Sequence, residues 1–355
     1  MASLPPQIQQ ADQALYAFFK GVSFSNHLNP INTTEAKRAF FLGAEGPPFA
    51  YNPLLRADEF LHRLDKIILK FDHPLAELIN QKIYATQLLI YALRDRTAHG
   101  FDALARHHRW YPESSILELD YEAQSDIQPL DRPAKILIKR FKKALEERHM
   151  ENWTIRTDTV MSARVQVDGP KRQLIVHPLA LFRQRDIERL IVHEIDVHAQ
   201  RADNGLRQPL KLFSMGLTGS LITEEGLAML AEERNGVQSP GAMARQLEVV
   251  KAIHSARHMG FRALFEHIRE SCGTALAWAI ALRVKRGLAN PEQPGVYAKD
   301  SVYLVGHQRV KDWLGKGGDI RHLYVGDVGM EHPIQLWLDE GWVELKETPR
   351  FWMAD

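Results

Sequence analysis

The sequence predicts an α+β fold, mainly helical, in which a small β-sheet directly precedes one buried helix. Two observations carry this prediction. Apolar residues recur at helical spacing over most of the chain, whereas residues 152–177 alternate as strands do. After these strands, an apolar run leads into residues 189–206, which are dense in histidine and carboxylate side chains. With 355 residues, the chain is long enough for one large domain or two smaller ones.

The N-terminal part is predicted to be helical apart from one long loop. Residues 8–22 are weakly amphipathic, and apolar periodicity predicts core helices over 57–71 and 74–94. Residues 25–53 are rich in Pro, Asn and Gly, which predicts mostly loop.

Prolines and acidic residues crowd residues 96–133, so we place a soft boundary near residue 130. The chain then divides into an N-terminal helical region, 1–130, and a second region, 131–355. The second region begins with a helix that is basic on one side, and strands and further helices follow. The predicted strands are 152–158, 163–168 and 173–177, and the predicted helices are 134–147, 240–258, 261–271, 274–286 and 301–314.

The segment His193-Glu-Ile-Asp-Val-His198 carries the strongest chemical signal in the chain. In the zinc peptidase motif H-E-x-x-H, the histidines stand four residues apart on one helix face and the Glu is the general base. Here they stand five apart, which separates them by roughly 140° on a regular α-helix. A wide turn of the π type, with about 4.4 residues, reduces this to roughly 50°. We therefore predict a π-bulge between His193 and His198.

A catalytic zinc site of the thermolysin type takes a third ligand, a Glu from a following helix, and keeps one position open for water. The candidate segment is 221–233, whose apolar periodicity predicts a second buried helix with Thr223 as its N-cap. Glu224 and Glu225 fall in its first turn, and either is a candidate ligand. The alternative is an acid that only complements the helix dipole. Asn204-Gly205 predicts the end of the histidine-bearing helix.

Several segments carry a family resemblance. They are HEIDVH at 193–198, Asn204-Gly205, Gln208-Pro209-Leu210, Glu224-Glu225-Gly226-Leu227-Ala228, Tyr303-Leu-Val-Gly306 and Leu323-Tyr-Val-Gly326. Together they resemble the QEGLA-motif family (flavohemoglobin expression-modulating QEGLA-motif proteins), bacterial proteins related to the eukaryotic microtubule-associated tyrosine carboxypeptidases. The resemblance extends over most of the chain after about residue 50. Two positions differ from the family pattern. Glu224 stands where the family has Gln, and Asp327 stands where a Lys often follows the segment Leu-Tyr-x-Gly.

The resemblance implies a thermolysin-like (gluzincin-type) zinc metallopeptidase core in residues 131–355. It implies that His193, His198 and Glu225 are the zinc ligands. It also implies that Glu194 is the general base. Two nearby residues are candidates for holding the ligand imidazoles, Asp196 and Gln200.

Two further roles are assigned to residues outside these helices. Tyr303 is the candidate donor to the oxyanion, because its hydroxyl is neutral and the resembled family keeps a Tyr there; Tyr324 is the substitute. A carboxypeptidase also needs a cation that pairs with the terminal carboxylate of its substrate, and arginine does this with two hydrogen bonds. We choose Arg164, on the strand before the helix, with Arg201 and Lys171 as substitutes.

The composition limits the partners and the compartment. Lys and Arg total 45 against 44 Asp and Glu, so we expect neither nucleic acid nor an anionic membrane as a partner. The single cysteine, Cys272, excludes an internal disulfide and suits a reducing compartment. The first residues lack the features of a secretory signal, and no apolar run approaches a membrane span. We expect a cytoplasmic protein; its oligomeric state is not predicted.

We therefore predict a zinc-dependent metallopeptidase, in particular a carboxypeptidase that releases C-terminal residues from peptides or proteins, with Zn²⁺ as cofactor and Glu194 as general base. The N-terminal region would wall its cleft. The metal hydrolase prediction rests on the residues themselves, and the carboxypeptidase prediction rests on the resemblance. One alternative is a metal-dependent endopeptidase or amidase. The other is a non-enzymatic regulatory or binding protein with a structural or vestigial metal site.

Overall fold

The computed structural model of the chain describes residues 4–124, 128–161 and 163–353. It is mainly helical, with two small sheets, which confirms the mainly helical α+β prediction. The first helices are α1 (Pro6–Gly21), α2 (Ser25–Leu28), α3 (Thr33–Phe41), α4 (Ala57–Asp65), α5 (Pro74–Asp95), α6 (Ala98–His107) and α7 (Ser114–Leu117). The middle helices are α8 (Ala134–Glu147), α9 (Gln184–Leu190), the π-helix η1 (Ile191–Ala199), α10 (Gln200–Leu206), the 3-10 helix η2 (Lys211–Ser214) and α11 (Ser220–Arg234). The last helices are α12 (Ala242–Ala256), α13 (Phe261–Lys285), η3 (Ala298–Ser301), α14 (Val302–Gly315), η4 (Ile320–Tyr324), α15 (Ile334–Asp339) and η5 (Arg350–Trp352).

The strands lie between α7 and α9; those at 154–157, 165–168 and 173–176 lie where the alternating pattern predicts strands, and those at 132–133 and 181–182 are not predicted. They are β1 (Arg132–Pro133), β2 (Thr154–Thr157), β3 (Val165–Asp168), β4 (Gln173–Val176) and β5 (Leu181–Phe182). The larger sheet has the order β2-β4-β3, with β2 parallel and β3 antiparallel to the central β4. The strands β1 and β5 form a separate antiparallel pair. In the larger sheet β3 is therefore an edge strand.

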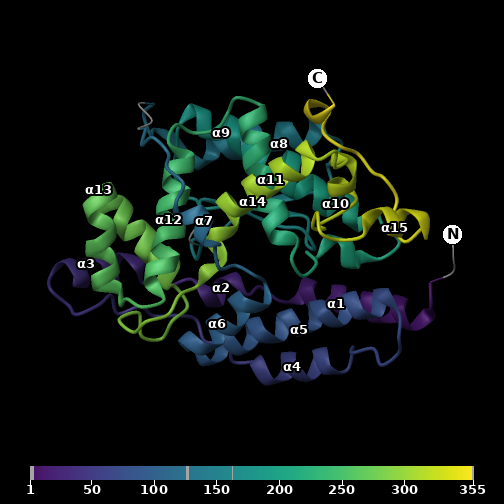
Figure 1. Cartoon of the computed structure of the whole chain (residues 1–355), viewed down its shortest axis with the longest axis horizontal. Coiled ribbons are helices and arrows are strands. Elements are labelled where there is room, and N and C mark those ends of the chain that lie inside the picture. Colours follow the sequence, from purple (N-terminus) through teal and green to yellow (C-terminus); the bar gives the residue numbers. More distant parts are fainter. Residues whose placement is uncertain (1–3, 125–127, 162, 354–355) are drawn as a thin grey trace.

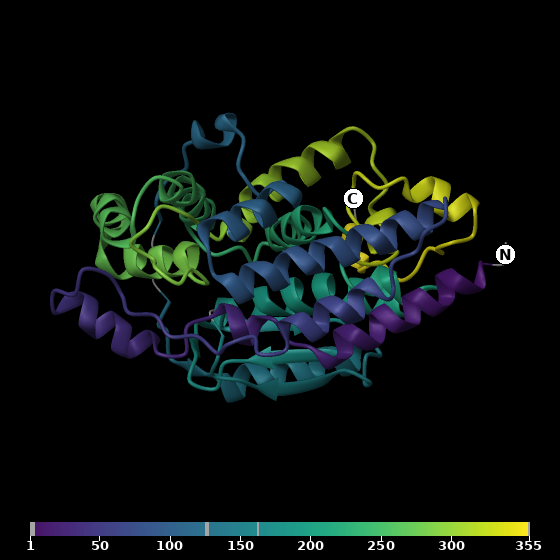
Figure 2. The same cartoon turned by 90° about the horizontal axis from the view of Figure 1, so that it is seen from below.

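The helices are arranged around the central pair α11 and α14 (Figure 1). The N-terminal helices α1, α4, α5 and α6 form a layer below this pair in that view. The helices α12 and α13 lie at one side, and the C-terminal segment with α15 lies at the other. Seen from below, α5 crosses the middle of the molecule and the three-stranded sheet lies at one margin (Figure 2).

Two parts of the N-terminal region differ from the prediction. The stretch 25–53 is mostly loop, as predicted, but it also contains α2 and α3, which the prediction lacks. The helix α3 forms because Phe40 packs its ring against Phe261 and Phe265 of α13, with centroids 5.2 Å and 5.1 Å away. Such distant partners leave no periodic signal in a short segment. The predicted helix 57–71 ends early, at Asp65. The helices 8–22 and 74–94 are confirmed as α1 and α5.

The later helices follow the prediction closely. The predicted pair 261–271 and 274–286 is confirmed, because α13 consists of two helices that meet at Gly273, whose backbone is not helical. This residue has a φ of 76°, which glycine adopts without steric cost. The predicted helices 134–147, 240–258 and 301–314 are confirmed as α8, α12 and α14.

The π-helix lies between two hydrophobic cores. Val192 and Val197 belong to the larger core, which contains residues of the N-terminal helices and of α11 to α15. Ile195 and Ala199 belong to a second core, built from α8, the strands and α9. Because the larger core contains residues from both sides of position 130, a division of the chain there stays a prediction.

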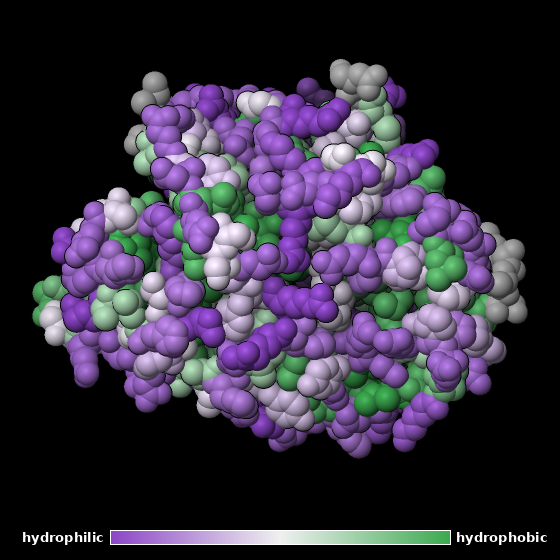
Figure 3. Space-filling view, viewed as in Figure 1, coloured by the Kyte–Doolittle hydropathy of each residue, from purple (hydrophilic) through white to green (hydrophobic). Residues whose placement is uncertain are grey.

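Most of the molecular surface in the view of Figure 3 is hydrophilic, and hydrophobic side chains on this face occur in separate groups. Among the described residues, no helix combines the length and apolarity that crossing a membrane requires.

Candidate metal centre

The predicted π turn is confirmed, and it is longer than a single bulge. Residues Ile191–Ala199 form a π-helix that is continuous with α9 before it and α10 after it. The wider turn brings the two histidines onto one face, and the ring centroids of His193 and His198 lie 4.8 Å apart. Both side chains are buried. The extra residue of the motif is therefore absorbed by the helix geometry, as its spacing requires.

The helix that carries the third candidate ligand begins earlier than predicted. Its first residue is Ser220, and the preceding Gly219 has a φ of 87°, so Thr223 is not the N-cap. The Thr223 hydroxyl instead accepts a hydrogen bond from the N–H of Met330 at 3.0 Å. Because the helix is longer, Glu225 lies beyond the first turn. A role that only complements the helix dipole is confined to the first turn, so it does not explain this carboxylate.

His193, His198 and Glu225 meet at one point of the buried interior. The Oε2 atom of Glu225 lies 3.6 Å from Nε2 of His193 and 3.5 Å from Nε2 of His198. Zinc bonds of about 2.0–2.1 Å at tetrahedral angles separate neighbouring ligand atoms by about 3.3 Å. The observed separations are close to that spacing.

The outer nitrogen of each imidazole is held by a second carboxylate. Nδ1 of His193 lies 2.7 Å from Oε1 of Glu232, which also accepts a hydrogen bond from Arg189 at 2.7 Å. Nδ1 of His198 lies 2.7 Å from Oε1 of Glu224. A carboxylate on Nδ1 places the proton there and leaves the Nε2 lone pair for a cation. Glu224, the rival candidate ligand, thus contacts the side of His198 that faces away from Glu225.

The residues predicted to hold the imidazoles have other partners, so that prediction is wrong. The carboxylate of Asp196 pairs with Arg148, and the Gln200 amide donates to Asn204 at 3.0 Å. Residues 196 and 200 lie on faces of the helix that the wide π turns direct away from the imidazoles. Glu232 was missed. Its position, seven residues after Glu225 and hence two turns along the same helix face, is the signal that would have indicated it.

Four carboxylates around the two imidazoles give the centre an excess of negative charge. Burial by itself lowers the pKa of His193, but Glu225, Glu232 and Glu194 raise it to about 9. The pKa of His198 is also raised, because Glu224 and Glu225 outweigh its burial. The pKa of Glu225 is lowered by the two histidines in spite of its burial. The centre therefore favours positive charge between these groups.

These residues fit a divalent cation such as Zn²⁺. The Oε2 atom of Glu225 is buried and has no hydrogen-bond partner among the described residues, although it lies between two imidazole nitrogens. Leaving a buried carboxylate oxygen without a partner costs about 1–3 kcal/mol or more. Two imidazole nitrogens and one carboxylate oxygen are also the donor set of zinc sites of the thermolysin type.

The three residues line a cavity of about 490 Å³, so the centre is accessible from one side. Glu194 and Tyr303 line the same cavity. The edge strand β3 forms part of its wall, and residues of α1, α2 and α5 form another part. Residues of the N-terminal helices therefore form part of the wall of this cavity. A structural metal site is closed, whereas a catalytic one keeps an open position.

Tyr303 and its substitute Tyr324 have different surroundings. Tyr303 is half-buried in the first turn of α14, and its hydroxyl has no hydrogen-bond partner among the described residues. Burial, together with the charge of Glu225, raises the pKa of this phenol well above its usual range, so the hydroxyl keeps its proton. The Tyr324 hydroxyl, in contrast, donates to the carbonyl of Asp196 at 3.1 Å and accepts from Trp352 at 2.9 Å. Tyr324 is a structural residue.

The structure does not bring Arg164 to the cavity. Its guanidinium donates to Asp186 at 2.9 Å and to the carbonyl of Leu181 at 3.0 Å, and it lies over the Phe182 ring. Its neighbour Val165 lines the cavity. Arg164 itself does not line the cavity, because its contacts with Asp186 and Leu181 hold its guanidinium elsewhere. A contact between Arg164 and substrate stays an untested prediction.

The substitutes for Arg164 are also engaged elsewhere. Arg201 is fully buried and donates to the carbonyl oxygens of Leu323 and Val328. Lys171 binds Asp168 at 2.8 Å and the carbonyl of Val22 at 3.0 Å. Neither lines the cavity, so both stabilise the surrounding structure.

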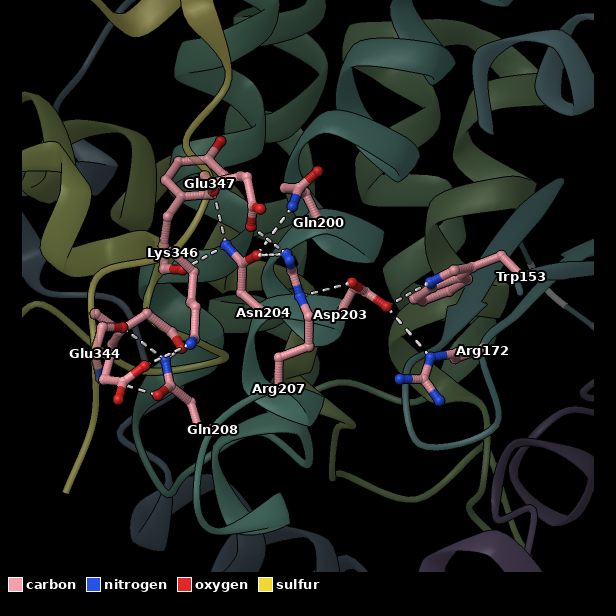
Figure 4. Close-up of polar contacts among 12 residues, drawn as sticks. Trp153, Arg172, Gln200, Asp203, Asn204, Arg207, Gln208, Glu344, Lys346 and Glu347 are labelled. Carbon is pink, nitrogen blue, oxygen red and sulfur yellow. Dashed lines mark hydrogen bonds and ion pairs between the residues drawn. The ribbon is translucent and has the colours of Figure 1, made fainter. Parts of the chain in front are cut away.

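Two amide side chains near the end of α10 hold the C-terminal segment (Figure 4). Their hydrogen bonds run from Asn204 to the carbonyl oxygens of Tyr324 and Glu347, at 2.6 Å and 2.8 Å, and from Gln208 to those of Val325 and Glu344, at 2.7 Å and 2.8 Å. The N–H of Glu344 donates back to the Gln208 amide at 2.9 Å. These motif residues therefore fix the chain after the π-helix rather than contact the metal centre.

Gly205 is not the left-handed cap that the Asn-Gly pair predicts. It lies inside α10, which continues to Leu206. A Cβ atom at this position would lie within 3.0 Å of the backbone of Phe213 and Ser214. The glycine is required because another segment packs directly against the helix, which local sequence patterns do not reveal.

Comparison with known proteins identifies the family of this chain. A family model described as microtubule-associated tyrosine carboxypeptidase matches residues 47–353. Microtubule-associated tyrosine carboxypeptidase 1 of Mus musculus is 33% identical over 158 residues, which are 43% of this chain and 33% of that protein. The Homo sapiens protein of the same name is 32% identical over the same shares. The putative tyrosine carboxypeptidase MATCAP2 of Mus musculus is 30% identical over 133 residues, 36% of this chain and 25% of that protein.

The matched part spans about a third or less of the length of these relatives. The family model, in contrast, covers most of this chain and includes every residue of the proposed metal centre. The resemblance that the motif segments predict is therefore confirmed. The chain belongs to the microtubule-associated tyrosine carboxypeptidase family.

Proposed function

We propose that this protein is a zinc-dependent metallopeptidase with a thermolysin-like centre, and that it removes residues from the C-termini of peptides or proteins. The observation that carries the proposal is the convergence of His193, His198 and Glu225 at a cavity that Glu194 also lines. Names of relatives support the carboxypeptidase part, since these proteins are described as tyrosine carboxypeptidases. We further propose residues 131–355 as the catalytic region and residues 1–130 as the wall of its cleft.

The residues of the chain have separate roles in this reaction. When bound, zinc polarises the scissile carbonyl and lowers the pKa of water at the open position. Glu194 accepts the proton of the attacking water and then passes it to the leaving amine. Tyr303 donates its neutral hydroxyl to the oxyanion of the tetrahedral intermediate. Glu232 and Glu224 keep both imidazoles in the orientation that leaves Nε2 free.

The edge strand β3 supports a mode of substrate binding. An extended peptide pairs with a free strand edge through main-chain hydrogen bonds, and pockets receive its alternate side chains. β3 has β4 on one side only and lines the cavity with Val165 to Asp168. We propose that the substrate backbone adds to this edge and that its terminal peptide bond then lies over the metal.

The test combines metal content with the choice of peptide end. The purified protein should contain about one zinc per chain by mass spectrometry, and His198→Ala should lose it. The zinc-loaded protein should release the last residue of a peptide with a free C-terminus and fail on its C-terminal amide. Equal cleavage of both, at internal bonds, would replace the proposal by an endopeptidase. Wild type that binds no zinc after reconstitution would exclude a zinc-dependent hydrolase and favour a binding protein.

A further inference from the structure

Three cationic side chains lie in the wall of the cavity that holds the metal centre. Arg283 and Arg286 come from the last turn of α13 and the residue after it, and Lys299 comes from η3. A single carboxylate, Asp300, lies among them and is buried. The long loop between α13 and η3 thus brings Lys299 to the part of the cavity wall that Arg283 and Arg286 also line. Positive charge is concentrated at this wall, whereas the neighbouring metal centre is rich in carboxylates.

The single carboxylate does not satisfy all three cations. Arg283 binds both oxygens of Asp300, since its Nε donates to Oδ2 and its Nη2 to Oδ1, each at 3.0 Å. Arg286 is only 5% exposed; its Nη1 lies 3.2 Å from Asp300, its Nη2 donates to Asp300 at 3.5 Å, and its guanidinium lies over the Tyr297 ring. Nevertheless its Nε and Nη1 atoms have no hydrogen-bond acceptor among the described residues. Nor does any described residue accept a hydrogen bond from the half-buried ammonium of Lys299.

Such an arrangement is costly unless a further anion completes it. A buried charged donor without an acceptor costs more than a neutral one, for which the penalty is about 1–3 kcal/mol. The planar guanidinium of Arg286 and the mobile ammonium of Lys299 together offer two or more positively charged hydrogen-bond donors, which a carboxylate can accept. The anion would enter from the cavity, because both residues line it.

We propose that Lys299 and Arg286 bind the terminal carboxylate of the substrate. This inference rests on the proposed carboxypeptidase function. In such an enzyme the terminal carboxylate follows the scissile carbonyl by one residue, and one residue spans at most about 3.6 Å. The anchor must therefore line the same cavity as the metal ligands. Lys299 and Arg286 meet this requirement, and Arg164 does not.

One competing explanation is that these cations only balance the carboxylates of the metal centre. In that case removing Lys299 would alter the affinity for zinc. It would change the binding of peptides with free and with amidated C-termini by the same factor. A carboxylate anchor makes the opposite prediction. Zinc content stays the same, and only the preference for a free C-terminus is lost.

Binding to a non-cleaving protein separates these possibilities. The probe is a fluorescein-labelled octapeptide that ends in tyrosine, as the free acid and as the C-terminal amide. Zinc-loaded Glu194→Gln should bind the acid about tenfold or more tighter than the amide, because only the carboxylate of the acid accepts charge-assisted hydrogen bonds from the two cations. Adding Lys299→Met should reduce this preference to about threefold or less at unchanged zinc content.

Two further variants guard against a folding defect. Lys299→Arg keeps the charge and should restore most of the preference. Lys142→Met, the same change at an exposed residue of α8, should leave it intact. Full acid preference in Lys299→Met overturns the inference, as does equal binding of acid and amide by the Glu194→Gln parent. If the acid preference is present but the wild-type protein cleaves neither peptide, the anchor stands and the proposed peptidase function fails.

Discussion

Gly226 of α11 and Gly306 of α14 are in direct backbone contact. A Cβ atom on Gly226 would lie within 3.0 Å of the backbone of Gly306, and one on Gly306 would lie equally close to the carbonyl of Ile222. The two helices therefore cross at the closest approach that backbones allow. Gly226 follows the proposed ligand Glu225, and Tyr303 lies one turn before Gly306. This crossing is what brings Tyr303 and Glu225 to the same cavity.

Gly306→Ala should destabilise the protein. The added methyl group has no space, and overpacking of this kind costs about 1–3 kcal/mol or more. We expect a lower midpoint of thermal unfolding, measured by circular dichroism, and reduced peptidase activity because Tyr303 shifts with α14. Gly315→Ala, at the end of the same helix with nothing within 4 Å of its added Cβ, is the matched control. An equal effect of both changes would contradict this explanation.

Glu232→Gln should weaken metal binding. The neutral amide holds the His193 proton less firmly than the carboxylate does, and loss of such a partner costs about 10–100-fold in metal affinity. Competition against a zinc chelator measures this effect. Glu233→Gln, at the adjacent residue that instead binds His307 and Lys311, should leave the affinity unchanged. Unchanged affinity in Glu232→Gln would show that His193 needs no such support.

Glu194→Gln should retain zinc and lose turnover. A general base contributes about 10²–10⁴-fold to the rate, and glutamine cannot accept the proton. Steady-state kinetics on a peptide with a free C-terminus, alongside metal analysis of the same sample, measures both properties. Retained activity at full zinc content would move the role of base to another residue.

Tyr303→Phe should lower kcat with little change in KM. Removing one donor to the oxyanion costs about 10²–10³-fold in kcat. Burial and the charge of Glu225 raise the pKa of this tyrosine, so its hydroxyl remains a donor at neutral pH. A variant that keeps the wild-type kcat would mean that Tyr303 only packs beside the centre.

Asp327 should make the stability of the protein depend on pH. Its burial and the charge of Glu224 raise its pKa to about 7. Between its ordinary pKa near 3.8 and this value, the folded protein binds a proton that the unfolded chain releases. The free energy of unfolding therefore falls as the pH rises through this window.

Removing the carboxylate should remove that part of the pH dependence. Relative to wild type at the same pH, the melting temperature of Asp327→Asn should rise between pH 4 and pH 8, by roughly 1–2 °C for each kcal/mol gained in a chain of this length. Asp312→Asn, at an exposed residue of α14, should show no such trend. A constant difference across this range for Asp327→Asn would show that the carboxyl group ionises freely.

Patterns within one segment predicted much of this protein. The spacing of His193 and His198 requires a wide turn, and the structure has a π-helix there. Apolar periodicity located α5, α8, α12 and α14, because these helices bury one face along their whole length. Alternation located the strands of the larger sheet. The motif segments predicted the family. In each case the physical cause of the feature lies within a few residues of the feature itself.

The tertiary structure decided what the residues of the centre contact. The residues alone left both Glu224 and Glu225 as candidates, and the resemblance implied Glu225. The folded chain shows that Glu225 faces both Nε2 atoms, which depends on how α11 packs against the π-helix. The same holds for Lys299 and Arg286, which carry no local motif. They reach the cavity because a long loop folds back onto α13. Sequence determines which groups are available, and packing between distant segments determines which of them meet, since the free energy that places them comes from burial of the whole core.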